Sequence, residues 1–222
     1  MHLDYNGIMK GALPMYCAII GDIVDSRKSA DRQALQDRFQ QTLADINSEY
    51  DAYIASNLTV TLGDECQGLM SVHYLWYEVI QKIREKMAPA RMRFGVGVGQ
   101  MSTHFEKHTS VGADGQPYWS ARQMLDTLKK ERKTRSILYH AGTPEDILIN
   151  ALLACIETIR SGRTDKQEAA ARAMALHGRQ ATAARELGIN QSAVSQRLQS
   201  ARYYELIDAE DQLGKYLIKK DY

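Results

Sequence analysis

The chain has 222 residues, of which 44% are hydrophobic, and its formal net charge is +1. This composition supplies enough apolar side chains for real cores, which excludes a disordered or fibrous protein. No apolar run approaches the roughly 18 residues that a membrane-spanning helix requires, and the first residues lack the basic-then-apolar pattern of a signal peptide. We therefore expect a cytoplasmic protein without membrane contact, and reduced core thiols at Cys17, Cys66 and Cys155.

The charge is distributed unevenly along the chain. Residues 160–202 contain eight Lys and Arg but three Asp and Glu, whereas the segments before and after them each have a small acidic excess. A basic block between two slightly acidic segments indicates that a polyanionic partner would bind there.

The first 142 residues alternate between strand and helix patterns. In chain order they predict a buried strand at 15–21, a helix at 28–53, a hairpin at 58–72, a helix at 74–87, a strand at 92–98, a helix at 117–130 and a short strand at 136–139. Such an order is typical of an α/β (α+β) sandwich of the ferredoxin-like type. We assign this domain to residues 15–142, after an N-terminal extension of residues 1–14.

Glycines punctuate the strand at 92–98 and its end. Gly95, Gly97 and Gly99 could line a phosphate, but they do not precede a helix as a dinucleotide-binding pattern requires. We interpret them as structural positions where another backbone comes close to the strand.

After the breaker Gly142-Thr143-Pro144 the pattern is helical, and we assign residues 143–222 to a separate all-α domain. A connecting helix is expected at 147–159, followed by helices at 172–177, 180–187 and 191–202. The last two predict a helix-turn-helix at residues 180–202. Ala184 is small where the helices would cross, Gly188 permits the sharp turn, and Asn190 is a suitable N-cap.

The stretch GINQSAVSQRLQSAR resembles the second half of region 4 in sigma factors and the LuxR-type regulators. The resemblance implies binding of double-stranded DNA, because Gln can pair bidentately with adenine, and Arg with guanine or phosphate, in the major groove. The alternative is that the same shape serves dimerisation or internal packing, although the basic charge favours DNA. The residues expected to bind DNA are Gln191, Ser192, Ser195, Gln196, Arg197, Gln199 and Arg202.

Two carboxylates are expected at one end of the sheet of the first domain. Asp22 follows the first strand and Asp64 lies at the hairpin tip, and those strands are neighbours in a ferredoxin-like sheet. Two carboxylates with water and phosphate oxygens are ligands that Mg²⁺ prefers. The other interpretation, that both are turn residues, stays open. For Asp25 and Glu65 we favour the turn interpretation.

The motifs IIGDIVDSR, TLGDECQGL, RFGVGVGQM and GADGQPYWSAR, followed by a helix-turn-helix, resemble the SatD family of bacterial proteins. That family is associated with stress-response loci. The resemblance therefore implies a DNA-binding regulator.

The same motifs are more distantly similar to the palm domain of class III nucleotide cyclases. This similarity implies metal ligands at Asp22 and Asp64, a transition-state arginine at Arg122, and a homodimer with a shared site. Tyr118 and Val60 depart from the cyclase pattern, because they replace an Asn that steadies the transition state and a Lys that selects the purine. The pattern implies a palm that binds a nucleotide but catalyses poorly or not at all. Its implied nucleotide contacts are Gly21, Ile23, Gly63 and Arg122.

Three functions remain on sequence grounds. The first is a transcription regulator of a stress response, whose α/β domain senses a ligand such as a nucleotide with Mg²⁺. The second is an Mg²⁺-dependent, cyclase-like nucleotidyl enzyme in which Arg122 would be catalytic. The third is a scaffold whose helical domain binds another protein.

Overall fold

The computed structural model describes residues 14–131 and 135–220, so nearly all of the predicted N-terminal extension (1–14) lies outside the described residues. The chain divides into two compact units. Unit 1 contains the sheet and consists of the described residues up to 131, Ser136–Asp146 and Lys220. Unit 2 is the helical stretch Ile147–Lys219, to which Arg135 is also assigned.

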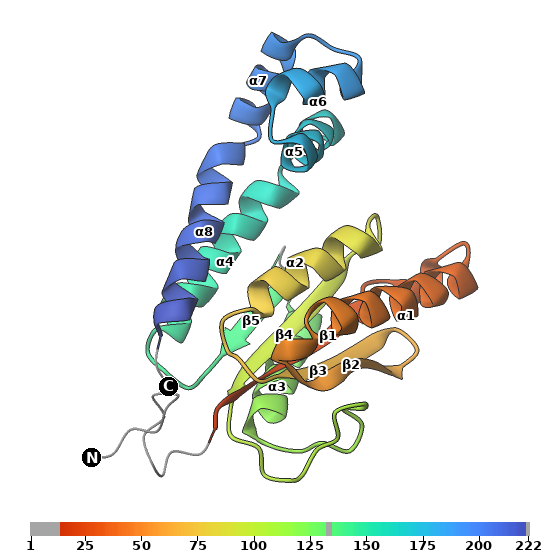
Figure 1. Cartoon of the computed structure of the whole chain (residues 1–222), viewed down its shortest axis with the longest axis vertical. Helices are drawn as coiled ribbons and strands as arrows, with labels where there is room; N and C mark the ends of the chain where they lie inside the picture. Colours follow the sequence, from red (N-terminus) through yellow and green to blue (C-terminus); the bar gives the residue numbers. More distant parts are fainter. Residues whose placement is uncertain (1–13, 132–134, 221–222) are drawn as a thin grey trace. The chain divides into compact units, whose positions relative to one another are not determined.

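Unit 1 is built on a mixed five-stranded sheet with the order β2-β3-β1-β4-β5 (Figure 1). Every neighbouring pair is antiparallel except β4 and β5, which are parallel. The first four strands have the predicted ferredoxin-like order, and β5 extends the sheet beside β4. The strands are β1 (Tyr16–Ile23), β2 (Ile54–Leu62), β3 (Glu65–Met70), β4 (Met92–Gly99) and β5 (Ile137–His140).

Helices cover both faces of this sheet. α1 (Arg32–Glu49) and α2 (Trp76–Met87) pack together on one face, and α3 (Gln116–Lys130) packs on the other (Figure 1). Short 3-10 turns follow β1 at Ser26–Lys28 and precede β2 at Asp51–Tyr53. The third helix is an addition to the ferredoxin-like pattern, since it joins β4 to the parallel strand β5.

The glycines of β4 explain how closely α3 approaches the sheet. Phe94 faces α2, where the Arg84 guanidinium lies 6.0 Å from its ring centre, whereas Gly95 and Gly97 face α3. A Cβ atom at either glycine would collide with a backbone oxygen of α3, that of Ala121 or Pro117. The interpretation of these two glycines as positions of close backbone approach is therefore confirmed.

Strand β1 is buried on both faces, as its apolar run predicts. Ala18 and Ile20 pack in one cluster with Tyr118, Ala121 and Leu125 of α3. Because alternate residues of a strand face the same side, Asp22 also faces α3. This placement determines the surroundings of its carboxylate.

Unit 2 contains the predicted helices and one more, but the helix predicted at 172–177 begins earlier, at Asp165, where Thr164 and Gln167 form a capping box. The predicted last helix ends at Ser200 instead of Arg202, because Arg202 adopts a left-handed φ of 51° that breaks the helical path. A further helix then begins, which lies beside the connecting helix (Figure 1) and is joined to it by an ion pair between Arg160 and Glu210. The helices are α4 (Asp146–Ser161), α5 (Asp165–His177), α6 (Gln180–Leu187), α7 (Gln191–Ser200) and α8 (Tyr203–Lys219).

The cysteines only partly match their prediction. Cys17 and Cys66 are buried free thiols, and burial raises the pKa of both. Cys155 is exposed, so its assignment to a core is wrong. It lies on α4 away from the side that buries Leu153 and Ile156. None of the helices described here is long and apolar enough to cross a membrane.

Candidate functional site

The helix-turn-helix is held by a small core and by two defined caps. Gly188 ends α6 with a left-handed φ of 63°, and the Ile189 N–H donates to the Ala184 carbonyl at 3.0 Å. Asn190 then caps α7 by accepting a hydrogen bond from the Ala193 N–H at 2.7 Å. These contacts fix the angle at which α7 leaves the turn. The buried core beneath is Ala170, Ala173, Ala183, Ala184, Val194 and Leu198.

One side of α7 is free of packing. Val194 and Leu198 point into the core, so Gln196 and Gln199 lie on the opposite side of the helix, where both are exposed. Of the other residues expected to bind DNA, Gln191, Ser192 and Arg202 are exposed, whereas Ser195 and Arg197 are partly buried. Ser192 donates to the Asn190 side chain at 2.8 Å and so supports the cap.

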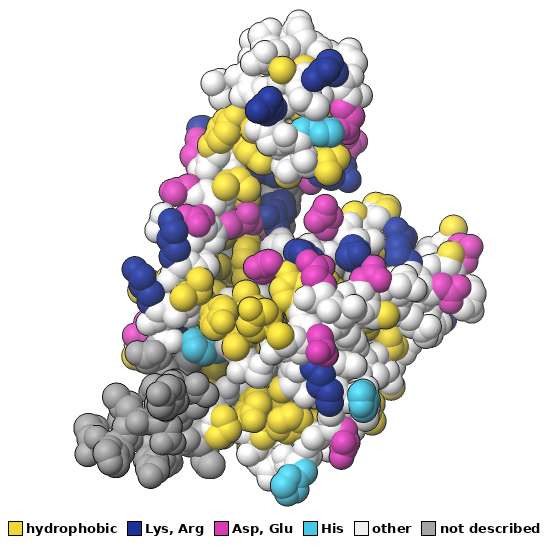
Figure 2. All heavy atoms as spheres, in the orientation of Figure 1, with side chains coloured by type: hydrophobic (Ala, Val, Ile, Leu, Met, Phe, Trp, Pro, Cys, Tyr) yellow, Lys and Arg dark blue, Asp and Glu magenta, His cyan; other side chains and the backbone are white. Residues whose placement is uncertain are grey.

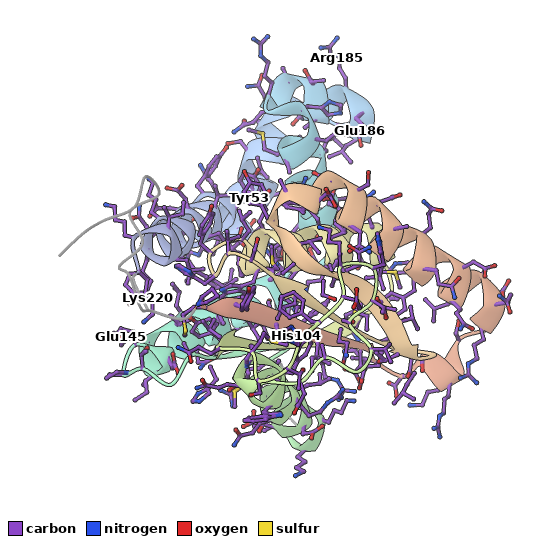
Figure 3. The ribbon with its side chains drawn as sticks, turned by 60° about the horizontal axis from the view of Figure 1, so that its bottom comes forward. Tyr53, His104, Glu145, Arg185, Glu186 and Lys220 are labelled. Atoms are coloured by element: carbon purple, nitrogen blue, oxygen red, sulfur yellow. The ribbon has the colours of Figure 1, made fainter. Side chains whose placement is uncertain are left out.

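Free positive charge flanks this helix. Arg202 pairs with Glu205 at 3.4 Å, but Arg179 and Arg185 are exposed and form no ion pair within the described residues. Arg185 projects away from the ribbon of α6 (Figure 3). Figure 2 shows dark-blue basic side chains set in a mainly white polar surface at the α5–α7 end of unit 2. The helix-turn-helix therefore exposes both polar and cationic side chains.

Unit 1 contains a different kind of site, which we call the charge cluster. Asp22 of β1 lies directly opposite Glu65 of β3 and Arg93 of β4 in the sheet. Arg122 and Lys129 cover this row from α3, because residues seven apart lie on one side of a helix. The cluster therefore combines two carboxylates with three cations.

Each carboxylate of the charge cluster is engaged by side-chain cations. Arg93 donates to both oxygens of Asp22, at 3.1 and 2.9 Å. Arg122 donates to both oxygens of Glu65, at 2.7 and 2.6 Å. The Lys129 ammonium lies 3.3 Å from Glu65 and 3.5 Å from Asp22. The side chains of Asp22 and Glu65 are 9% and 6% exposed, so the carboxylates are buried, whereas the cations that bind them reach solvent in part.

The electrostatics favour the ionised form of Glu65. Burial opposes ionisation of Glu65, but the hydrogen bond and charge of Arg122, together with Lys129, outweigh it and hold the pKa of Glu65 below its ordinary value. The same hydrogen bond raises the pKa of Arg122. Arg122 is thus held and neutralised within unit 1.

Asp64 lies near Asp22 in the backbone but differs in its contacts. The Ile23 N–H donates to the Asp64 carbonyl at 2.9 Å, so the two residues do reach the same end of the sheet. The Asp64 carboxylate accepts a hydrogen bond from the Ser26 hydroxyl at 2.5 Å. The Asp22 carboxylate instead binds the cations of the cluster.

This arrangement does not fit a Mg²⁺ site. A divalent cation needs the carboxylate oxygens of Asp22, but Arg93 already binds both of them and Lys129 adds a second positive charge beside them. Among the described residues, no group of three or more His, Cys, Asp or Glu side chains is arranged to hold a metal ion.

The implied nucleotide contacts are placed as follows. Gly21 lies inside β1, where a Cβ would come within 2.6 Å of the Phe94 ring. Ile23 is buried at the end of the same strand. Gly63 lies in the β2–β3 turn with a φ of 41°. Asp22 lies opposite Glu65 in the sheet, and Glu65 binds Arg122, so Asp22 and Arg122 belong to the same cluster. Gly63 takes no part in it.

Sequence reasoning missed three members of the charge cluster. Glu65 is the first residue of β3 and is buried, so its interpretation as a turn residue is wrong. No role is predicted for Arg93, and Lys129 begins a charged run whose pattern predicts a solvated helix end or a grip on phosphate, not a partner for buried carboxylates. Two features of the sequence indicate the cluster. Arg122 and Lys129 are seven residues apart and so lie on one side of α3, and the pairing of the strands aligns Asp22 with Glu65 and Arg93. By contrast, Asp25 has a φ of 57° and pairs with Lys28 at 3.1 Å, as suits a turn residue.

Solved structures of nucleotide cyclases are similar to this chain in fold. A bacterial light-regulated adenylyl cyclase is 14% identical, with a TM-score of 0.42 over 60% of this chain and 79% of that chain. The guanylyl cyclase domain of the RhoGC fusion protein from the aquatic fungus Blastocladiella emersonii is 16% identical, with a TM-score of 0.38 over 52% and 74%. A rhodopsin-guanylyl cyclase core in complex with ATPalphaS is 16% identical, with a TM-score of 0.37 over 52% and 73%.

At these identities and scores the similarity concerns the fold alone. A comparison with curated proteins gives no match. The SatD family model, in contrast, matches residues 16–206, which include the sheet, the charge cluster and the helix-turn-helix. The chain therefore belongs to the SatD family.

Proposed function

We propose that this protein is a cytoplasmic DNA-binding regulator of transcription in which α7 enters the major groove. The observation that carries the proposal is the free side of α7. Gln196 and Gln199 are exposed on a helix whose orientation is fixed by a buried core and by the Asn190 cap. A rigid helix with an unpacked polar side is what base recognition in the major groove requires.

The surrounding charges suit the two parts of a DNA contact. The amide groups of Gln196 and Gln199 can pair with base edges, which gives sequence preference. Arg179 and Arg185 are exposed and form no ion pair among the described residues, so they can contact phosphates, which gives affinity without sequence preference. The excess of Lys and Arg in residues 160–202 supports a polyanionic partner over a protein scaffold role.

Under this proposal the protein acts as a homodimer at stress-response genes. Two copies would present two α7 helices to an inverted-repeat site, as dimeric helix-turn-helix proteins do. Unit 1 would serve as the ligand-sensing part. We favour this function over a cyclase-like enzyme, because Arg122 is bound by Glu65 and the oxygens of Asp22 are bound by Arg93.

The test is selection of sites from a randomised duplex pool with the full chain, followed by binding titrations at several salt concentrations. The proposal predicts an enriched inverted repeat whose affinity falls as salt rises, because phosphate contacts release counterions. Gln196→Ala should relax the preference at one or two base pairs and weaken the selected site by about 1–3 kcal/mol. Gln40→Ala, which removes an exposed glutamine of α1, is the matched control and should change neither the base preference nor the affinity for the selected site.

Two outcomes would contradict the proposal. One is the absence of any salt-sensitive binding to duplex DNA, which would leave the helical unit as a protein-binding scaffold. The other is an unchanged base preference in Gln196→Ala, which would remove the free side of α7 from the interface.

A further inference from the structure

A surface groove of about 640 Å³ runs beside α3 in unit 1. Its lining combines Ile20 of β1 and the aromatic residues Tyr118 and Trp119 with the polar and charged residues Gln67, Arg122 and Lys130. The volume is within the range of roughly 300–1,000 Å³ found for small-molecule sites. The groove therefore has the size and the mixed lining of a ligand site.

The hydroxyl of Tyr118 is the first sign that something binds there. Tyr118 is 5% exposed, and its hydroxyl has no hydrogen-bond partner among the described residues. A buried hydroxyl without a partner is destabilising, and such groups are rare in folded proteins. Burial raises the pKa of the Tyr118 phenol, which keeps it a proton donor at neutral pH. An acceptor from a ligand in the groove would satisfy it.

The neighbouring Trp119 is the second sign. Its side chain is 56% exposed, although tryptophan is one of the larger apolar side chains. The indole N–H donates to the Asp114 carboxylate at 2.6 Å, which restrains the ring at the side of the groove. A restrained, exposed indole offers a flat surface on which a planar ring can stack.

The charge of the lining indicates the sign of the ligand. Lys130 and Asp126 of the lining cancel, and the charge cluster to which Arg122 belongs has one positive charge in excess, because it combines three cations with two carboxylates. Arg122, which lines the groove, binds Glu65 through its two terminal nitrogens. A ligand with a single anionic group matches this balance.

We propose that the groove along α3 binds a planar aromatic anion whose ring stacks on Trp119 and whose acceptor atom takes the hydrogen bond of the Tyr118 hydroxyl. Two classes of molecule share this chemistry, nucleoside monophosphates and aromatic carboxylic acids. Binding at this site requires no metal ion. It also does not depend on whether unit 2 binds DNA, so either proposal can fail alone.

The experiment is isothermal titration of the full chain, in the presence of a chelator, with AMP and separately with indole-3-carboxylate. Two controls each lack one feature of AMP: adenosine lacks the negative charge, and inorganic phosphate lacks the aromatic ring. Saturable binding of AMP, tighter than that of either control, assigns the groove to a nucleotide. Saturable binding of indole-3-carboxylate alone assigns it to an aromatic acid. No binding of either probe at millimolar concentration overturns the proposal.

Variants separate a ligand contact from a structural role. Tyr118→Phe should lower the affinity for the probe about tenfold, which corresponds to the loss of about one hydrogen bond. The same change should leave the thermal midpoint of the ligand-free protein equal or higher, because it removes a hydroxyl without a partner. Trp119→Ala should weaken binding to a similar extent. Tyr53→Phe, an exposed tyrosine of the turn before β2 (labelled in Figure 3), should change neither quantity.

The proposal is overturned if Tyr118→Phe lowers the thermal midpoint of the free protein and leaves the affinity for the probe unchanged. That result would mean that the hydroxyl already has a partner within the fold.

Discussion

The charge cluster of unit 1 and the helix-turn-helix of unit 2 use arginine in opposite ways. In the cluster, Arg93 and Arg122 each bind a buried carboxylate through two hydrogen bonds. In the helix-turn-helix, Arg179 and Arg185 are exposed and without an ion pair in the described chain. The difference shows that the partner of a cation, and not its type, decides whether the cation is held within the fold or exposed to solvent.

The two arrangements have different physical causes. Cross-strand register places Glu65, Asp22 and Arg93 side by side, so their charges meet wherever the sheet forms. On a short amphipathic helix such as α6, only one side reaches the core, and Arg185 lies on the side that does not. Changes in unit 1 should therefore alter stability, and changes on the surface of unit 2 should alter binding.

The largest effect is expected from removing the anion that holds Arg122. Glu65→Ala should cost about 2–3 kcal/mol, because it leaves Arg122 without its ion-pair partner and removes one of the two carboxylates beside Lys129. We place the loss below that of a fully buried pair, because the side chains of Arg122 and Lys129 are 39% and 35% exposed and water solvates them in part. Denaturant unfolding of the variant measures this loss.

Asp37→Ala is the matched control for that change, since Asp37 is an exposed acidic residue of α1. It should stay within about 0.5 kcal/mol of the parent. An equally small effect for Glu65→Ala would mean that the cluster does not support the fold.

A second contrast comes from one glycine in each unit. Gly97→Ala should destabilise unit 1 by about 2 kcal/mol, because its Cβ would collide with the backbone of α3. Gly214→Ala in α8 should instead stabilise by about 0.5–1 kcal/mol, since nothing lies within 4 Å of a Cβ there and alanine favours a helix. Thermal unfolding distinguishes the two signs. A loss of stability in both variants would contradict the difference between the crowded position of Gly97 and the open position of Gly214.

A third prediction concerns the cap that orients α7. Asn190→Ala should cost about 1 kcal/mol, because the side chain of Asn190 accepts from the Ala193 N–H. Asn190→Asp keeps an acceptor at this position and should be close to neutral. The helical signal of the denaturation curve reports the change, and equal losses in the two variants would refute the capping role.

The smallest effect is a pH dependence specific to Glu65. Its pKa in the folded protein lies below the ordinary value of 4.5, so the ionised form stabilises the fold. This contribution is complete above the ordinary pKa and is lost as pH falls through the folded one. The stability difference between the parent and Glu65→Gln should therefore shrink as the pH falls below about 4.5. A difference that is constant from pH 7 to pH 3 would exclude this role.

Much of the fold follows from local sequence patterns. The order of strands and helices in unit 1 is readable because each strand is a short apolar run bounded by breakers, and each helix has apolar spacings of three and four. The turn at Gly188 and the cap at Asn190 are local signals too, and the structure contains both.

The parts that could not be predicted depend on contacts between distant residues. Glu65 follows a Gly-Asp turn, and only the register of β3 against β1 and the position of α3 show that it is buried beneath Arg122. Cys155 has apolar neighbours in the sequence, yet the side of α4 that is buried depends on how that helix packs within unit 2. The end of α7 at Ser200 depends on one backbone angle, that of Arg202.

The most direct test of the central claim measures the salt dependence of duplex binding in two double variants of the full chain. Arg179→Ala/Arg185→Ala removes free cations of the helical unit. Lys82→Ala/Lys86→Ala removes two cations of α2 that are paired with Glu49 and Asp45. The account predicts that the slope of log affinity against log salt falls by about two in the first variant and is unchanged in the second, with similar stability in both. Equal slopes in the parent and the first variant, or an equal loss in the second, would contradict it.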